Sequence, residues 1–268
     1  MTNSTLIRES KYKVNKLRHL NILLAEDNPL NSKLVSILFL QNGVKLQIAE
    51  NGAEAVEKIK ENDYDLVLMD MEMPVLNGYQ ATTLIRQQLK NNVPIIAMTA
   101  HAMAGEREKC LQLGMNDYIS KPINEDRLFT AIYNLTSGKK VTGENAGTVI
   151  SPASYGFEEK VCNLDYLVDA TRGNKNMMHN IVEVFMEETR TELSALNAAI
   201  IKTNYSIISD ISHKIKSSFS LLGITALDPV FAEMEQLATN DSGIEKIRLL
   251  SHRINMVFYQ AKEEMKGI

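Results

Sequence analysis

The sequence predicts two domains of different class, a parallel α/β sheet with helices on both faces and then an all-α antiparallel helical bundle. In the first half, short apolar runs alternate with helical stretches, as in strand–helix repeats. The composition changes after Leu135, and beyond about residue 158 only helical periodicity is found. A length of 268 residues is enough for two such domains.

Polar side chains follow four of the predicted strands, where each strand ends. The apolar runs are residues 22–25, 66–69, 95–98 and 118–119, and the polar residues after them are Glu26, Asp27, Asp70, Thr99 and Lys121. The carboxyl ends of parallel strands lie at one edge of a sheet and form the ligand site there. These side chains are therefore expected to converge, although they lie far apart in the sequence.

Three carboxylates close together repel one another, by roughly 4 kcal/mol for a pair about 4 Å apart at an effective dielectric constant near 20. Lys121 offsets one charge, and the remainder favours a hard divalent cation such as Mg²⁺. A carboxylate beside Mg²⁺ and a lysine can attack phosphorus and form an aspartyl phosphate, with Thr99 and Lys121 holding the phosphoryl oxygens. The competing interpretation is a set of helix caps, and it suits Glu26 or Asp27 alone because Asn28-Pro29 is typical of a helix start.

Residues 19–137 resemble the receiver domain of two-component response regulators, through segments 22–31, 66–78, 95–100 and 114–122. The resemblance implies a flavodoxin-like sheet of five parallel strands in the order 2-1-3-4-5. It also implies roles for individual residues. Asp70 would be the phosphoacceptor, and it would hold Mg²⁺ together with Glu26, Asp27 and the Glu72 main-chain carbonyl. Thr99 and Lys121 would contact the phosphoryl group, and Tyr118 would be an aromatic switch.

The segments depart from this family's pattern in specific places. Glu26 replaces the commoner aspartate, and its longer side chain should still reach the metal. Glu72 and His101 lie two residues after Asp70 and Thr99, where the family places side chains beside the path of attacking water. We expect Glu72 and His101 to tune the lifetime of the aspartyl phosphate.

The rest of the chain divides at changes in composition. Residues 1–18 are polar and basic and are expected to be a tail or a linker remnant. Residues 138–158 lie in a stretch rich in Gly, Ser, Thr and Asn and are expected to be a flexible linker. Residues 159–268 carry several apolar stripes at helical spacing, joined by short loops, which predicts the antiparallel bundle.

One of these helices carries His213. At about 100° per residue, its side chain points away from the apolar stripe of its helix, and Lys216 and Ser217 share its face. Ser220 completes a patch of small polar residues. An imidazole there can be a nucleophile, and small neighbours let a partner approach. The alternative is an ordinary surface histidine, which is our interpretation of His19, His101, His179 and His252.

The set His213, Lys216 and Ser218 resembles the H-x-x-K-x-S signature of histidine phosphotransfer (HPt) domains, within residues 159–267. The resemblance implies that His213 is phosphorylated, that Lys216 assists, and that Ser217, Ser218 and Ser220 form the docking face. Ser217 departs from the family, which commonly has glycine there.

Together these features predict a phosphorelay protein. A sensor histidine kinase upstream would phosphorylate Asp70, and His213 would pass the phosphoryl group to a separate response regulator downstream. The Gly-, Ser-, Thr- and Asn-rich stretch of 22 residues, 136–157, spans about 26 Å, which allows the two domains of one chain to dock and transfer in cis. Two alternatives stay open: a receiver that only switches a helical interaction domain, and an aspartyl-phosphate hydrolase.

Several classes of protein are disfavoured. The chain has no ATP-binding segments, so it is not a kinase by itself, but it could form the C-terminal portion of a hybrid histidine kinase. A net charge of −4 without a basic block argues against nucleic-acid binding. The sequence contains no run of 18 apolar residues, so no membrane span is predicted, and no signal peptide is evident. Cys110 and Cys162 suit a reducing cytoplasm.

Overall fold

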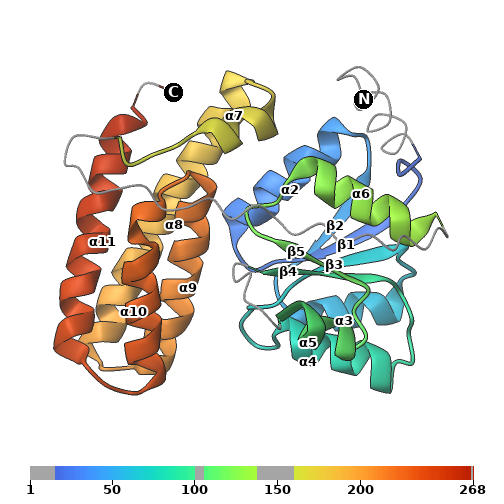
Figure 1. Ribbon diagram of the computed structural model, residues 1–268, viewed down its shortest axis with the longest axis horizontal. Helices are drawn as coiled ribbons and strands as arrows, with labels where there is room; N and C mark the ends of the chain where they lie inside the picture. The colour runs from blue at the N-terminus through green and yellow to red at the C-terminus, as the bar shows by residue number, and fades with distance from the viewer. Residues whose placement is uncertain (1–15, 100–105, 138–159, 267) are drawn as a thin grey trace.

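The computed structural model describes residues 16–99, 106–137, 160–266 and 268 of the chain. Their fold has two parts, an α/β domain and a helical domain, which lie side by side (Figure 1). Leu17, inside the expected tail, is buried against the α/β core. The expected linker of residues 138–158 and the side chain of His101 lie outside the described residues.

The α/β domain is built on a five-stranded parallel sheet in the order β2-β1-β3-β4-β5, as the sequence predicted. The strands are β1 (Asn21–Ala25), β2 (Lys45–Ala49), β3 (Leu66–Asp70), β4 (Ile95–Thr99) and β5 (Asp117–Ser120). Every residue of β3 and β4 is buried, which explains their unbroken apolar sequences. The edge strand β2 is largely exposed and carries the polar residues Lys45 and Gln47.

Helices cover both faces of this sheet (Figure 1). One face carries α2 (Pro29–Gln41) and α6 (Glu125–Thr136), packed on alternate strand residues such as Ile22 and Leu68. The other face carries α3 (Gly52–Glu61), α4 (Gly78–Thr83), a π-helical turn η1 (Leu84–Gln88) and α5 (Glu106–Gln112). Cys110 is buried in α5, whereas Cys162 precedes α7 in an irregular segment.

The helical domain is an up-and-down bundle of four long helices with a short helix at one end (Figure 1). The short helix is α7 (Asp165–Thr171), and the long ones are α8 (Lys175–Ile201), α9 (Tyr205–Leu221), α10 (Asp228–Thr239) and α11 (Ile244–Glu264). A 3₁₀ turn, η2 (Thr225–Leu227), connects α9 to α10. Asn174 and Asn204 accept backbone N–H groups at the starts of α8 and α9, which fixes where these helices begin.

The bundle core follows the predicted stripes, with Phe185, Phe219, Phe231 and Phe258 stacked at its centre. Ile207 is an exception because it is 44% exposed, whereas its neighbour Ile208 is fully buried. The buried cluster on the α2 face of the sheet continues without a break into the bundle. The two domains are therefore joined through an apolar contact formed by α2 against α7, α8 and α9.

Candidate functional site

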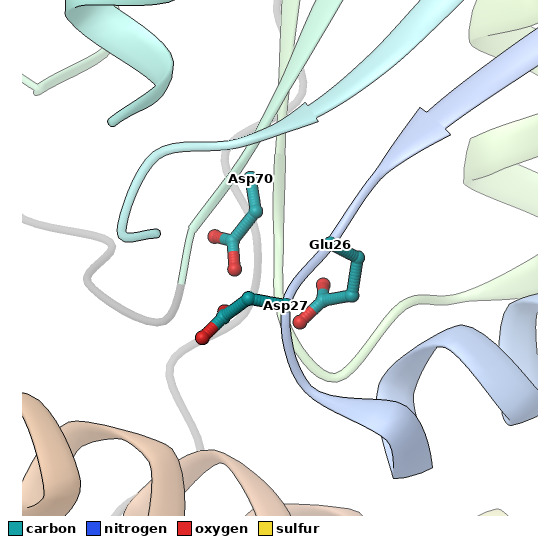
Figure 2. A group of neighbouring side chains, drawn as sticks. All are labelled: Glu26, Asp27 and Asp70. Atoms are coloured by element: carbon teal, nitrogen blue, oxygen red, sulfur yellow. The ribbon is translucent and has the colours of Figure 1, made fainter. Parts of the chain in front are cut away.

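Three acids meet at the carboxyl edge of the sheet. Glu26 and Asp27 follow β1, Asp70 ends β3, and their carboxylate oxygens lie within 4.8 Å of one another (Figure 2). Lys121, directly after β5, places its Nζ 2.6 Å from Glu26 Oε2 and 2.8 Å from Asp70 Oδ2. The sequence-predicted convergence of these residues is therefore present in the fold.

This acid cluster holds more negative charge than its buried lysine offsets. Burial, and next the charge of Asp70, raise the pKa of Glu26 to about 8. Burial also raises the pKa of Asp27. Burial works against the charge of Lys121, but Asp70 and Glu26 outweigh it and raise the Lys121 pKa above its usual range. Three hard carboxylate donors at this spacing, with surplus negative charge, fit a small divalent cation such as Mg²⁺.

The remaining predicted residues of the α/β domain lie on β4, on β5 and just after β3. Thr99 ends β4 in a buried position, and its carbonyl accepts a 2.7 Å hydrogen bond from the Lys121 N–H. Tyr118 lies buried on β5. The backbone N–H of Glu72 donates to Asp70 Oδ1 at 3.3 Å. The Asp70 carboxylate thus contacts groups that follow β3 and β5, and it lies near the two acids that follow β1.

His213 of α9 faces this edge of the sheet from the other domain. Its Nδ1 lies 2.7 Å from Glu72 Oε2 and 3.8 Å from Glu235 Oε1, a carboxylate on α10. The predicted direction of His213, away from the stripe of α9, is correct. The predicted exposure is wrong, because the α/β domain covers this face and leaves the His213 side chain only 13% exposed.

The serines of α9 contact the first turns of α2. Asn28 Nδ2 donates to Ser218 Oγ at 2.8 Å, and Asn31 Nδ2 donates to Ser217 Oγ at 2.9 Å. Both serines are buried, so the expectation of an open docking face applies only when the domains are apart. Ser220 lines a small, mostly apolar pocket at the same junction.

The partners of two lysines on α9 differ. Lys216 lies 4.0 Å from Glu235 Oε2 within the helical domain, near His213. Lys214 reaches across the junction, with its Nζ 2.6 Å from Asp27 Oδ2. Lys214 therefore contributes positive charge to the acid cluster, a role that the sequence analysis missed.

Burial alone would lower the pKa of His213. The hydrogen bonds to Glu235 and Glu72, with the negative charges of Glu72 and Asp70, outweigh burial and raise the His213 pKa to about 9. This arrangement favours the protonated imidazole, which lies near carboxylates from both domains.

A cavity of about 530 Å³ opens between the domains beside these groups. Its lining includes Asp27, Glu72 and Thr99 from one domain and His213, Lys214 and Glu235 from the other. The cavity is large enough for a phosphoryl group, a metal ion and several waters. Group transfer between the two domains needs a shared chamber of this kind.

Comparison with known proteins assigns both domains. The family model described as the response regulator receiver domain matches residues 22–133, and the Hpt domain model matches residues 180–263. The chain is a receiver domain joined to an Hpt domain. No helix among the described residues is long and apolar enough to cross a membrane.

Similar proteins combine these modules with others. The chain is 28% identical over 224 residues to the signal transduction histidine-protein kinase BarA of Escherichia coli (strain K12), covering 81% of this chain and 24% of BarA. It is 27% identical over 247 residues to the sensor histidine kinase GacS of Pseudomonas protegens, covering 90% of this chain and 27% of GacS. The chain thus spans about a quarter of the length of these curated relatives.

A solved structure resembles the receiver half. It is the receiver domain of a sensor histidine kinase from Pseudomonas aeruginosa, which is 41% identical and has a TM-score of 0.42. The match covers 44% of this chain and 98% of that one.

Proposed function

We propose that the chain is a two-site phosphorelay module in which Asp70 accepts a phosphoryl group and passes it to His213 of the same chain. The observation that supports this most directly is the 2.7 Å contact between His213 and Glu72, which lies two residues after Asp70. Receiver and Hpt domains are phosphotransfer modules, and here the His213 imidazole lies at the phosphoacceptor edge of the sheet.

In the first step, the Asp70 carboxylate attacks phosphorus, and the bond from phosphorus to the donor's leaving group breaks. Lys121 and Thr99 would hold the phosphoryl oxygens, and Tyr118 would respond to their occupancy. Glu26, Asp27, Asp70 and the Glu72 carbonyl would hold Mg²⁺, which when bound neutralises charge on the phosphoryl group and on the cluster.

In the second step, a bond forms between an imidazole nitrogen of His213 and phosphorus, and the bond between phosphorus and Asp70 breaks. Carboxylates of Glu72 and Glu235 approach Nδ1, so we assign attack to Nε2. The attacking nitrogen needs a lone pair, so its proton passes to water before the bond forms. The Asp70 carboxylate takes the electron pair of the broken bond.

The class of partners follows from this chemistry. A sensor histidine kinase would phosphorylate Asp70, and a separate response regulator would take the phosphoryl group from His213. Because the chain spans about a quarter of BarA, the same module could serve as the C-terminal portion of a hybrid histidine kinase. His101 and Glu72 are proposed to tune the lifetime of the aspartyl phosphate. The domain boundaries proposed for the module are residues 19–137 and 159–268.

The decisive experiment uses acetyl phosphate with Mg²⁺ on the wild-type chain, Asp70→Asn and His213→Gln, and records the stability of the label in acid and base. We expect label on both sites in the wild type, no label in Asp70→Asn, and only a base-labile acyl phosphate in His213→Gln. Label confined to Asp70 in the wild type would contradict the relay and favour a receiver that acts only as a switch on the helical domain.

A further inference from the structure

The two domains also touch at a second place, outside the acid cluster and the His213 contacts. Helix α7 lies beside α2, above the bundle (Figure 1). The Tyr166 hydroxyl donates a 2.9 Å hydrogen bond to the carbonyl of Ile123, a buried receiver residue shortly after Lys121. Burial raises the pKa of Tyr166 well above its usual range, which keeps this hydroxyl a donor.

A polar group at the end of α7 extends this contact. Arg172 donates to Glu125 Oε1 at 3.2 Å and to Asn42 Oδ1 at 3.4 Å. Asn42 in turn donates to Glu125 Oε1 at 2.9 Å. The three side chains therefore form a closed network that joins the Hpt domain to both receiver helices of this face, α2 and α6.

The backbone at Arg172 is unusual. Arg172 has a φ of 52°, in the left-handed region that residues other than glycine seldom adopt. A glycine would be the low-cost choice at this helix end, and Gly173 follows directly. The chain instead places at this point an arginine whose guanidinium reaches the other domain.

Other contacts between the helical domain and α2 accompany this network. Gln41 of α2 donates to the Met177 sulfur of α8 at 3.7 Å. Leu167 of α7 and Leu34 of α2 are both buried members of the cluster that crosses the junction. This part of the junction is therefore a packed surface.

None of these residues belongs to the acid cluster or contacts His213. Helix α7 also lies outside residues 180–263, where the Hpt family model matches. The contacts are thus made by the N-terminal part of the helical domain, outside the segment that the family model matches, and do not touch the groups of the chemical step. What they can contribute is the choice of partner.

We propose that Tyr166, Arg172 and Met177 form a cis-selecting clamp, a docking surface whose partner is the receiver domain of the same chain. Its receiver half consists of Gln41, Asn42, Ile123 and Glu125. The clamp makes self-docking, and hence transfer from Asp70 to His213, faster than with a receiver that lacks these side chains. The kinetic part of this proposal rests on the proposed phosphorelay function, whereas the docking part does not.

A charge swap in the full chain tests the clamp. Arg172→Glu and Glu125→Arg each place like charges at the junction, and the double variant restores opposite charges. Small-angle scattering would report separation of the domains, and acetyl phosphate labelling would report the rate of transfer. We expect each single variant to slow transfer about ten-fold and to raise the radius of gyration, and the double variant to return within about two-fold of the wild type.

The controls separate recognition from folding. Arg253→Glu reverses an exposed charge on α11, the helix farthest from the receiver in Figure 1, and should change neither measurement. Tyr166→Phe deletes only the clamp hydroxyl and should slow transfer about five-fold. An unchanged radius of gyration and transfer rate in Arg172→Glu would overturn the clamp. A double variant whose transfer is as slow as the two single effects added together would also overturn it. If His213 is never labelled in any variant, the relay fails, while scattering still decides the clamp.

Discussion

Lys214 of the Hpt domain places its Nζ 2.6 Å from Oδ2 of Asp27, an acid of the receiver cluster. A side chain from one domain thereby occupies a carboxylate that a metal ion would need in the other. Lys214 and Mg²⁺ are therefore expected to compete for Asp27, and by linkage each should weaken the binding of the other.

The first prediction concerns this competition. Lys214→Gln should tighten Mg²⁺ binding about five-fold, because the carboxylate of Asp27 no longer has to leave an ammonium. Calorimetric titration of the full chain with Mg²⁺ measures the change. Lys216→Gln is the matched control, since Lys216 pairs with Glu235 rather than with the cluster. Equal affinities in Lys214→Gln and the wild type would contradict the competition between Lys214 and Mg²⁺.

The second prediction concerns the buried lysine. Lys121→Met leaves Glu26 and Asp70 without their shared cation, so it should lower the free energy of unfolding by about 3 kcal/mol in the absence of divalent ions. Added Mg²⁺ should recover much of this loss, because a bound cation replaces the missing charge. Urea unfolding followed by circular dichroism, with and without Mg²⁺, gives both values.

Its control is Lys33→Met on the exposed side of α2, which should change stability little under either condition. A Lys121→Met chain that is as stable as the wild type without Mg²⁺ would contradict the charge balance argued for the cluster.

The third prediction separates two roles of Asn28. Its Oδ1 accepts the N–H groups of Leu30 and Asn31 and so caps α2, while its Nδ2 donates to Ser218. Asn28→Ser keeps an oxygen for the cap and removes the amide NH₂ group that reaches Ser218. It should leave receiver stability within about 0.5 kcal/mol of the wild type but weaken docking.

Asn28→Ala removes both roles and should also cost about 1 kcal/mol of stability. Thermal unfolding measures the first effect, and small-angle scattering measures the second. If Asn28→Ser and Asn28→Ala loosen the junction to different extents, the cap and the docking contact are not separable as we expect.

The fourth prediction compares two glycines of the helical domain. Gly223 has a φ of 64°, and a Cβ there would lie 2.4 Å from the carbonyl oxygen of Asn163. Gly173 has a φ of 69° but nothing within 4 Å of a Cβ. Gly173→Ala should cost about 1 kcal/mol from backbone strain alone, and Gly223→Ala about 3 kcal/mol or more because a packed backbone must also shift. The urea midpoint of the helical signal at 222 nm ranks them, and equal costs would refute the steric argument.

Much of this fold could be predicted because its signals are local. Each residue of the acid cluster lies at or just after the end of its strand, and the parallel order of the strands brings Glu26, Asp70 and Lys121 together. The direction of His213 followed equally from helical geometry. These inferences require only the period of side-chain directions along a helix or strand, and the rule that the carboxyl ends of parallel strands lie at the same edge of a sheet.

The surroundings of His213 could not be predicted in the same way. Its contact with Glu72 joins residues from two domains. The hydrophobic pattern of each domain does not indicate how the two domains are positioned against each other. Lys214 was missed because its partner lies across that junction, and Glu235 because it lies on the next helix. Asn28 was recognised only as a cap, since its second hydrogen bond exists only when the domains are in contact.

The covering of His213 by the receiver domain also affects how quickly another protein could take a phosphoryl group from it. If the relay operates as proposed, a phosphoryl group on His213 is inaccessible to another protein while the domains are docked. The contacts of Asn28, Asn31 and Lys214 hold the receiver domain over it. Another protein can collect the group only when the halves part, and such rigid-body separations typically take microseconds to milliseconds. The lifetime of the closed state would then limit the rate of output, so that contacts between the domains, and not only the reactivity of the phosphoryl group, would set this rate.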